Sequence, residues 1–312
     1  MIRLTYGLVL SAIVASLTPV LSADTNDAKL APKKILYFTK SSGFEHSAIK
    51  DPATHPSKLG GDLNGISFPI IKAIAAKNNI QVVFSKDGSL FSEAYLAQFD
   101  AVVFYTTGDL TTSGTDKNPP MSAAGKQALF DYIKSGKGFV GLHSATDTFH
   151  SNSPKGAPHF QSDGDNADEY IKMIGGEFVS HGKQQPSVLT QIDTTFPGVQ
   201  AIPATGITEE WYSMKNFPSD LHVLLVQNTA GMQGFQYERA QYPSTWVHSY
   251  GKGRVFYTNL GHRDDIWMSS MYQGLIAGAL NWATGRVDID LTPNIDTVTP
   301  QANKGPADPV KK

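Results

Sequence analysis

A histidine stands at the end of a short apolar run, at a place where enzymes with a similar turn carry their nucleophile. The run is Gly138-Phe-Val-Gly-Leu-His143, and the small residues Ser144 and Ala145 follow it. Such a run predicts a central strand whose carboxyl end exposes one side chain, which is Ser or Cys in nucleophile-elbow enzymes. The chain contains no Cys, so chemistry through a thiolate is excluded. His143 therefore indicates imidazole chemistry at the usual place of a nucleophile.

A second histidine ends the segment 246–262, which has the pattern of a strand, a tight turn and another strand. Gly261 lets the backbone turn, so that His262 is left at the end of the second strand. A histidine in this place can act as a general base, donate a hydrogen bond to an oxyanion or bind a metal. The alternative is a structural histidine whose ring is held by hydrogen bonds.

Two more histidines, His46 and His181, follow predicted strands or lie in loops near them, and the family resemblance described below adds a carboxylate, Glu209 or Glu210. Loops after the strands of a doubly wound sheet converge on one edge, so these residues can meet the first two histidines there. Three imidazoles and a carboxylate form a ligand set that suits zinc or another transition metal. No compact spacing such as His-x-x-x-His supports a metal, and the sequence leaves the cofactor open.

Ser144 and two aromatic residues complete the predicted pocket. Ser144 is one residue out of frame with Gly-x-Ser-x-Gly, which indicates a hydrogen-bonding group of the pocket and not the nucleophile of a Ser hydrolase. Trp211 and Tyr212 can form a flat apolar wall against a sugar ring, because aromatic faces bury C–H surfaces while nearby polar groups hold the hydroxyls.

Strand and helix patterns alternate along the first half of the chain. Strands joined by helices in this way run parallel, through right-handed crossovers. We therefore expect an α/β fold, a flavodoxin-like three-layer sandwich with a mainly parallel central sheet. The predicted strands lie at 34–39, 82–84, 101–105, 139–142, 188–192, 223–226, 244–250 and 254–259. The predicted helices lie at 68–77, 90–99, 123–135, 169–174 and 271–282.

The two ends of the chain differ from the rest in composition. Residues 1–23 have the pattern of a secretory signal, with Arg3 near the start and a mostly apolar core. The core is shorter than the ~20 residues of a membrane span, so we expect no span in the mature chain, which we place in the periplasm or outside the cell. An uncleaved anchor is the alternative. The expected organisation is a signal peptide at 1–23, a flexible lead-in at 24–32, one domain at 33–286 and a disordered, Pro-rich tail at 287–312.

Charge limits the partners of the chain. The net charge is −2 over 312 residues, which provides no basic surface, so a nucleic-acid partner is not expected. The sequence does not indicate an oligomeric state.

Several motifs, taken in their order along the chain, resemble the ThuA-like (trehalose utilisation) family of the class I glutamine amidotransferase-like superfamily. The similarity covers approximately residues 33–286. The motifs are Ser42-Gly-Phe44-Glu-His46, Gly141-Leu-His143, Gly175-Gly-Glu-Phe178-Val-Ser-His181, Glu209-Glu-Trp211-Tyr212 and the block 246–262.

The resemblance carries over a fold and the position of a pocket, but not the reaction of the amidotransferases. In those enzymes the elbow Cys lies in a Gly-x-Cys turn and its partner His follows a late strand. By that pattern His143 takes the position of the Cys, and His262 resembles the partner. Glutamine hydrolysis through a covalent thioester is therefore excluded by residue type.

The family resemblance implies disaccharide utilisation, on an oxidised (3-keto) glycoside or its product, so the expected partner is a small carbohydrate. A ketone acidifies neighbouring C–H bonds, so a His or Glu base with an oxyanion-stabilising donor or metal can drive isomerisation or elimination. The competing hypotheses are metal-dependent hydrolysis and a catalytically inactive carbohydrate-binding or scaffold protein. The predicted catalytic residues are His143, His262 and Glu210, and the predicted substrate-binding residues are His46, Ser144, His181, Trp211 and Tyr212.

Overall fold

The chain is described by a computed structural model, which covers Met1 and residues 31–50, 65–152 and 158–307. The predicted signal segment lies outside the described residues apart from Met1, as does the predicted lead-in before Ala31. Within the described part of the chain, no helix has the length and apolar character needed to cross a membrane.

An eight-stranded sheet forms the centre of the fold, with the strand order β2-β1-β3-β4-β12-β11-β10-β7. The five strands from β2 to β12 run parallel, and the remaining three pair antiparallel. The predicted α/β fold with a mainly parallel sheet is confirmed. The strands are β1 Lys33–Phe38, β2 Ile80–Ser85, β3 Ala101–Phe104, β4 Gly138–Leu142, β7 Leu189–Gln191, β10 His222–Gln227, β11 Tyr242–Tyr250 and β12 Gly253–Thr258.

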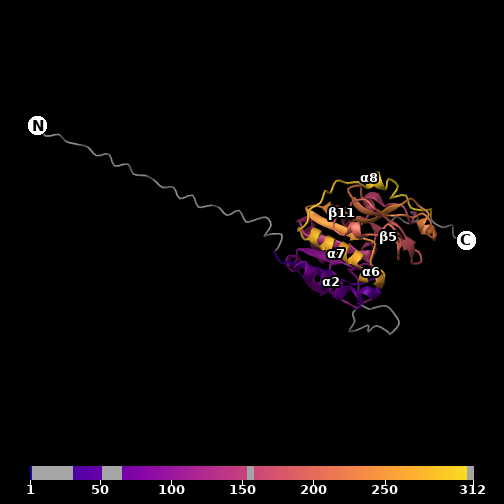
Figure 1. Cartoon of the computed structure of the whole chain (residues 1–312). Helices are drawn as coiled ribbons and strands as arrows, with labels where there is room; N and C mark the ends of the chain where they lie inside the picture. Colours follow the sequence, from indigo (N-terminus) through magenta and orange to yellow (C-terminus); the bar gives the residue numbers. More distant parts are fainter. Residues whose placement is uncertain (2–30, 51–64, 153–157, 308–312) are drawn as a thin grey trace. The chain divides into compact units, whose positions relative to one another are not determined.

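Helices cover both faces of this sheet, because alternate residues of a central strand point to opposite sides. Ile35 and Tyr37 of β1 pack into one apolar cluster with helices α2 and α7, which lie side by side in Figure 1. Leu36 and Phe38 pack into a second cluster with α3, α4 and α5 on the opposite face. The result is the predicted three-layer sandwich. These helices are α2 Ser67–Lys77, α3 Glu93–Leu96, α4 Ala123–Lys134, α5 Glu169–Ile174 and α7 Ser270–Ala283.

Two small antiparallel sheets, which the sequence analysis does not predict, lie outside the central sheet. One pairs β5 (Glu177–His181) with β9 (Tyr212–Lys215), and the other pairs β6 (Gln185–Ser187) with β8 (Ile207–Glu209). Their strands carry or flank His181, Glu209 and Glu210. The short helices are α6 Asp264–Met268, α8 Ile295–Val298 and the 3₁₀ turns η1 Ser47–Ile49, η2 Gly88–Leu90, η3 His143–Asp147, η4 Gly164–Asn166, η5 Val199–Ala201 and η6 Phe235–Tyr237.

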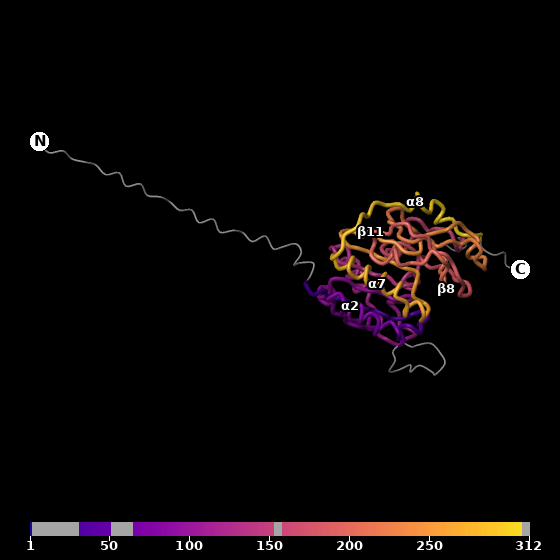
Figure 2. Tube along the Cα trace, in the orientation of Figure 1, coloured from indigo at the N-terminus to yellow at the C-terminus, as the bar shows by residue number. Residues whose placement is uncertain are grey.

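The segment 287–307 differs from the predicted disordered tail. It carries α8, and Ile295 and Ala302 are buried against the second apolar cluster. The side chain of Asn303 hydrogen bonds both the N–H and the carbonyl of Phe217. In Figure 2 this yellow segment runs along the half of the fold that contains β10, which α8 contacts. Few but well-placed apolar and amide side chains hold a Pro-rich segment that composition alone classifies as disordered. Residues 308–312 lie outside the described part.

Candidate active site

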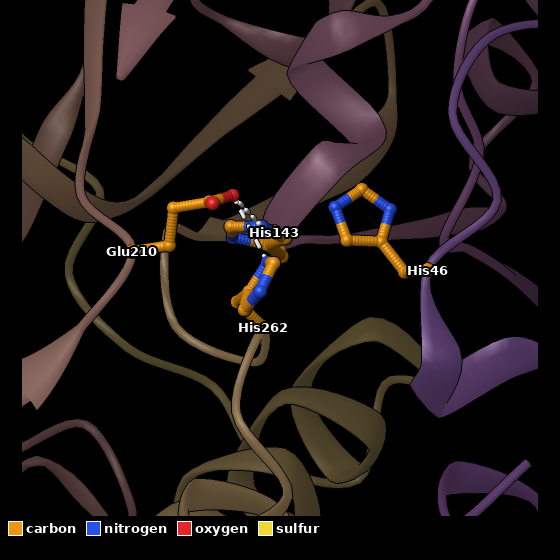
Figure 3. Close-up of side chains that lie close together, drawn as sticks. All are labelled: His46, His143, Glu210 and His262. Carbon is orange, nitrogen blue, oxygen red and sulfur yellow. Dashed lines mark ion pairs between the residues drawn. The ribbon is translucent and has the colours of Figure 1, made fainter. Parts of the chain in front are cut away.

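Three histidines from distant segments meet at the carboxyl edge of the parallel strands. His46 lies in the segment after β1, His143 directly follows β4, and His262 lies in the turn after β12. Their ring centroids are 5.0 to 5.3 Å apart. Figure 3 shows the three rings together with Glu210, which follows β8. The structure thus brings these imidazoles together at one edge, as expected for loops that follow parallel strands of one sheet.

The backbone of His143 has the sharp turn that its position after a central strand indicates. Its φ is +43°, in the left-handed region, and the side chain is fully buried. Nδ1 lies 2.9 Å from the carbonyl oxygen of Asn259. Because a carbonyl only accepts, Nδ1 carries the proton and Nε2 of the neutral ring keeps its lone pair. Nε2 lies 3.6 Å from Oε2 of Glu210.

Glu210 is the carboxylate that the histidines surround. Its Oε2 lies 2.9 Å from Nδ1 of His262, and its Oε1 lies 3.3 Å from Nδ1 of His181. Burial alone would raise the pKa of Glu210, but the imidazoles of His143 and His262 beside the carboxylate lower it well below its usual range. Glu210 is therefore ionised at neutral pH.

The two most buried histidines of the cluster are neutral at neutral pH. Burial lowers the pKa of His143, against the opposing effect of Glu210. Burial also lowers the pKa of His46 far below its usual value, and the neighbouring rings of His143 and His262 lower it further. The site is thus an anionic carboxylate among imidazoles that offer lone pairs.

Glu209 has a different role from its neighbour in sequence. Its carboxylate is fully buried and accepts hydrogen bonds from the backbone N–H groups of Gly261, His262 and Glu210, at 2.9, 3.2 and 2.8 Å. Burial raises the pKa of Glu209 to about 7. Glu209 therefore fastens the turn that carries His262 to the end of β8, and only Glu210 faces the histidines.

An open cavity of about 450 Å³ adjoins this cluster on the side of His262. Its rim carries two exposed apolar side chains, Phe44 and Met268, of which 67% and 56% are accessible to solvent. The other lining residues are charged or polar, so the cavity combines apolar surface with groups that hydrogen bond. They are Ser47, Lys50, Gln184, Arg263, Asp264 and Asp265.

The remaining predicted polar residues lie around the cluster at different depths. The His181 side chain is 44% exposed and forms the outer side of the site. Ser144 is fully buried beside His143, and its Oγ has no hydrogen-bond partner among the described residues. Tyr212 is buried, with its ring centroid 4.3 Å from that of His143 and its hydroxyl 3.5 Å from Nε2 of His46. Tyr212 therefore supports the histidines from within the protein.

The predicted aromatic wall of Trp211 and Tyr212 differs from the structure. Trp211 is fully buried in the first apolar cluster, and its indole N–H donates to the carbonyl of Gln185 at 2.8 Å. Neither ring presents a face to solvent, because sequence alone does not separate a core aromatic from an open one. The exposed ring beside the site is that of Phe44, whose centroid lies 5.0 Å from that of His46 in an edge-on arrangement. Phe44 belongs to one of the motifs that resemble the ThuA-like family, and the sequence alone does not mark it as a pocket residue.

Comparisons with known proteins identify the family of the chain and agree with its fold. The family profile ThuA, described as trehalose utilisation, matches residues 34–283. A ThuA-like protein from Bacteroides uniformis is similar in structure, with a TM-score of 0.55 and 19% identity over 81% of this chain and 92% of that chain. A ThuA-like protein from Parabacteroides merdae has a TM-score of 0.54 and 18% identity over 82% and 91%. At these identities the likeness shows a shared fold. No curated protein matches the chain.

Proposed function

The chain belongs to the ThuA family, whose description supports a carbohydrate-related role, and from this premise we propose that it is an exported enzyme acting on a 3-keto disaccharide or glycoside. The reaction takes place where the cluster of His46, His143, Glu210 and His262 meets the open cavity. The observation that carries the proposal is the ionised Glu210 carboxylate held among histidines at the edge of a cavity.

The cavity supports a small-molecule substrate. Its volume of about 450 Å³ lies within the range of ligand pockets, which are roughly 300–1,000 Å³. Phe44 offers an apolar face to the C–H side of a sugar ring, while Gln184 and Arg263 offer donors to hydroxyls. This combination of surfaces is what carbohydrate recognition needs.

The proposed reaction begins at a C–H bond next to the ketone. A base removes the proton, and the electron pair of the C–H bond moves toward the ketone oxygen to give an enediolate, which a donor or cation stabilises. Protonation of the former ketone carbon, with loss of the hydroxyl proton on the carbon that was deprotonated, moves the ketone by one carbon and completes an isomerisation. Loss of the substituent on the next carbon, with its bonding electron pair, completes an elimination.

The cluster can supply the base and the electrophile in two ways. His262, oriented by the carboxylate of Glu210, can take the proton, as a carboxylate orients the base of a catalytic triad. Alternatively, His46, His143, Glu210 and His262 would hold a metal ion, which would supply Lewis-acid chemistry at the ketone oxygen. His143 is fully buried and directs its Nε2 at Glu210 in both cases. Both routes require Glu210.

The test uses the purified full chain, a 3-keto disaccharide and product analysis by mass spectrometry. We expect turnover by the wild type and a loss of at least about 100-fold in Glu210→Gln and His262→Ala, which is typical of losing a proton-transfer group. His159→Ala is the matched control, because His159 is exposed and outside the site. Saturable binding in calorimetry without any product would instead favour the inactive carbohydrate-binding protein.

Export is a separate part of the proposal and has a separate test. The pattern of residues 1–23 supports cleavage after Ala23. Expression in a bacterial host followed by N-terminal sequencing of the periplasmic and medium fractions should give a chain that begins near Asp24. Full-length chain in the cytoplasmic or membrane fraction would contradict it.

A further inference from the structure

We propose that His46, His143, His262 and Glu210 bind one divalent transition-metal ion, with zinc as the ion that fits best. The inference concerns the site of the proposed function and deepens it, since the ion would be the electrophile of that reaction. Metal binding is measured without substrate, so a failure of the metal site and a failure of the proposed function can be told apart.

The first observation is the convergence of four ligand atoms. One nitrogen from each histidine and one carboxylate oxygen of Glu210 all lie within 4.8 Å of one another. Ligands at ~2.1 Å from a tetrahedral zinc ion are about 3.4 Å apart. The separations from Glu210 Oε2 to His262 Nδ1 and His143 Nε2 are 2.9 and 3.6 Å, on either side of that value. Figure 3 shows the four side chains pointing inward from separate segments.

The second observation is an unpartnered lone pair in the interior. His143 Nε2 is buried and has no hydrogen-bond partner among the residues described. Nε2 faces Oε2 of Glu210 at 3.6 Å. Both atoms are of the kind that bind a transition metal, and a cation between them would give Nε2 the partner that it lacks.

The third observation is the tautomer of His143. The Nδ1–H group of a metal-ligating histidine that binds through Nε2 is usually fixed by a carbonyl or carboxylate, which orients the ring. Here the carbonyl of Asn259 accepts from Nδ1 at 2.9 Å. The ring is therefore held with its lone pair toward Glu210. Glu209 holds the backbone of the turn that carries His262, through the N–H groups of Gly261 and His262.

The kind of ion follows from the donors and their charge. Three imidazole nitrogens and one carboxylate suit zinc and related transition metals, whereas magnesium and calcium prefer oxygen ligands. A divalent ion with one carboxylate keeps a net positive charge of one. That charge can polarise a ketone oxygen entering from the cavity beside His262. His181 does not belong to the ligand set and remains for proton transfer at the exposed side.

The test is titration of zinc chloride into tag-free, chelator-treated full chain by calorimetry, with metal content measured by mass spectrometry. We expect one zinc ion per chain, and an affinity at least about 100-fold lower in Glu210→Gln and His262→Ala. His159→Ala should bind zinc like the wild type. His181→Ala removes a partner of Glu210 and not a ligand, so it should lose about 10-fold in affinity, the lower end of the range for such partners, while losing turnover. Circular dichroism checks the folding of each variant.

Absence of a stoichiometric ion in the wild type would overturn the metal site. Zinc affinity equal to that of the wild type in folded Glu210→Gln and His262→Ala would overturn it as well. A cobalt titration gives a second readout, because a tetrahedral site gives intense visible absorption and a loose surface site does not. If zinc binds but no keto sugar is turned over, the metal site stands and the proposed function fails. If turnover survives chelation without bound metal, the proposed function stands and the ion is not its electrophile.

Discussion

Two glutamates that are neighbours in sequence show how strongly environment decides the role of a residue. The carboxylate of Glu209 is enclosed by backbone N–H groups, while that of Glu210 is enclosed by imidazoles. The pKa of Glu209 is raised by burial, and the pKa of Glu210 is lowered because the effect of the neighbouring histidines outweighs burial. The sequence offers both as candidates, and only the direction of each side chain separates them.

The substitution Glu209→Gln should destabilise the protein by about 1–3 kcal/mol, the cost of leaving buried polar groups unsatisfied. The amide nitrogen of the glutamine would replace one of the two carboxylate oxygens and would face the N–H group of Glu210, or those of Gly261 and His262. An amide nitrogen cannot accept hydrogen bonds from these donors. Urea denaturation followed by fluorescence measures the change in the free energy of unfolding. An unchanged transition midpoint would show that the carboxylate does not hold the turn.

The substitution His143→Asn should leave the protein folded and reduce turnover by at least about 100-fold. Asn tolerates the left-handed backbone conformation that His143 adopts at φ +43°, but it cannot supply Nε2 at the centre of the cluster. Steady-state kinetics on a 3-keto disaccharide and circular dichroism check the two halves of this expectation. Wild-type activity in the folded variant would remove His143 from the site.

A histidine outside the site should make stability depend on pH. The two ring nitrogens of His150 face Asp147 and Glu177 at 2.7 and 3.1 Å. Burial would lower the pKa of His150, but these carboxylates outweigh it and raise the pKa from 6.5 to about 9. A raised pKa means that the stabilisation is complete below the unfolded value of 6.5 and is lost as the pH rises through about 9.

The pH dependence can be assigned with one variant and one control. Thermal unfolding between pH 6 and 10 should show wild-type stability falling over this interval more steeply than that of His150→Gln. His159→Ala should keep the slope of the wild type. Parallel curves for the wild type and His150→Gln would mean that His150 is not charged in the folded state.

The strands and turns determine where the three histidines of the cluster lie. Each histidine follows the carboxyl end of a parallel strand, and a tight turn sets the direction of its side chain. Gly261 has φ +124°, and a Cβ there would lie 2.5 Å from the hydroxyl of Tyr272. Both the backbone conformation and the close approach require glycine. The turn after β12 thus depends on one residue without a side chain.

The substitution Gly261→Ala should cost about 1–3 kcal/mol of stability, as for a residue forced into a strained conformation, and should lower turnover because His262 is displaced. Gly274→Ala is the matched control. Gly274 lies in α7 with open space where a Cβ would be, so alanine should be neutral or stabilising by up to about 1 kcal/mol. Chemical denaturation of both variants checks the contrast. Equal stabilities would contradict the role given to Gly261.

The sequence predicts the elements of the parallel half well and those beyond it poorly. Strands β3 and β4 are buried along their whole length, so they appear as apolar runs bounded by turn residues. Strands β6 and β8 have three residues each and contain polar side chains, so no periodicity marks them. Their positions are set by pairing between distant segments, which a local pattern does not contain.

In the whole molecule, the site combines three histidines whose place the sequence predicts with a carboxylate whose place it does not. The loops after β1, β4 and β12 bring three histidines to one edge, as parallel topology requires. Glu210 arrives from the small β6–β8 sheet, whose place follows from tertiary packing. The sequence therefore identifies the histidines by their place after strands, and identifies the carboxylate only through resemblance. The prediction that Trp211 lines the pocket is wrong, because whether an aromatic side chain is buried depends on the complete fold.

The most direct test of the account is hydrogen exchange on the substrate. A 3-keto disaccharide is incubated with the full chain in D₂O, and mass spectrometry and NMR measure deuterium at the carbon next to the ketone. We expect deuterium uptake with the wild type, in substrate or product, and uptake at the uncatalysed rate with folded Glu210→Gln. Uptake at equal rates with both proteins, or none with a wild-type protein that binds the sugar, would contradict it.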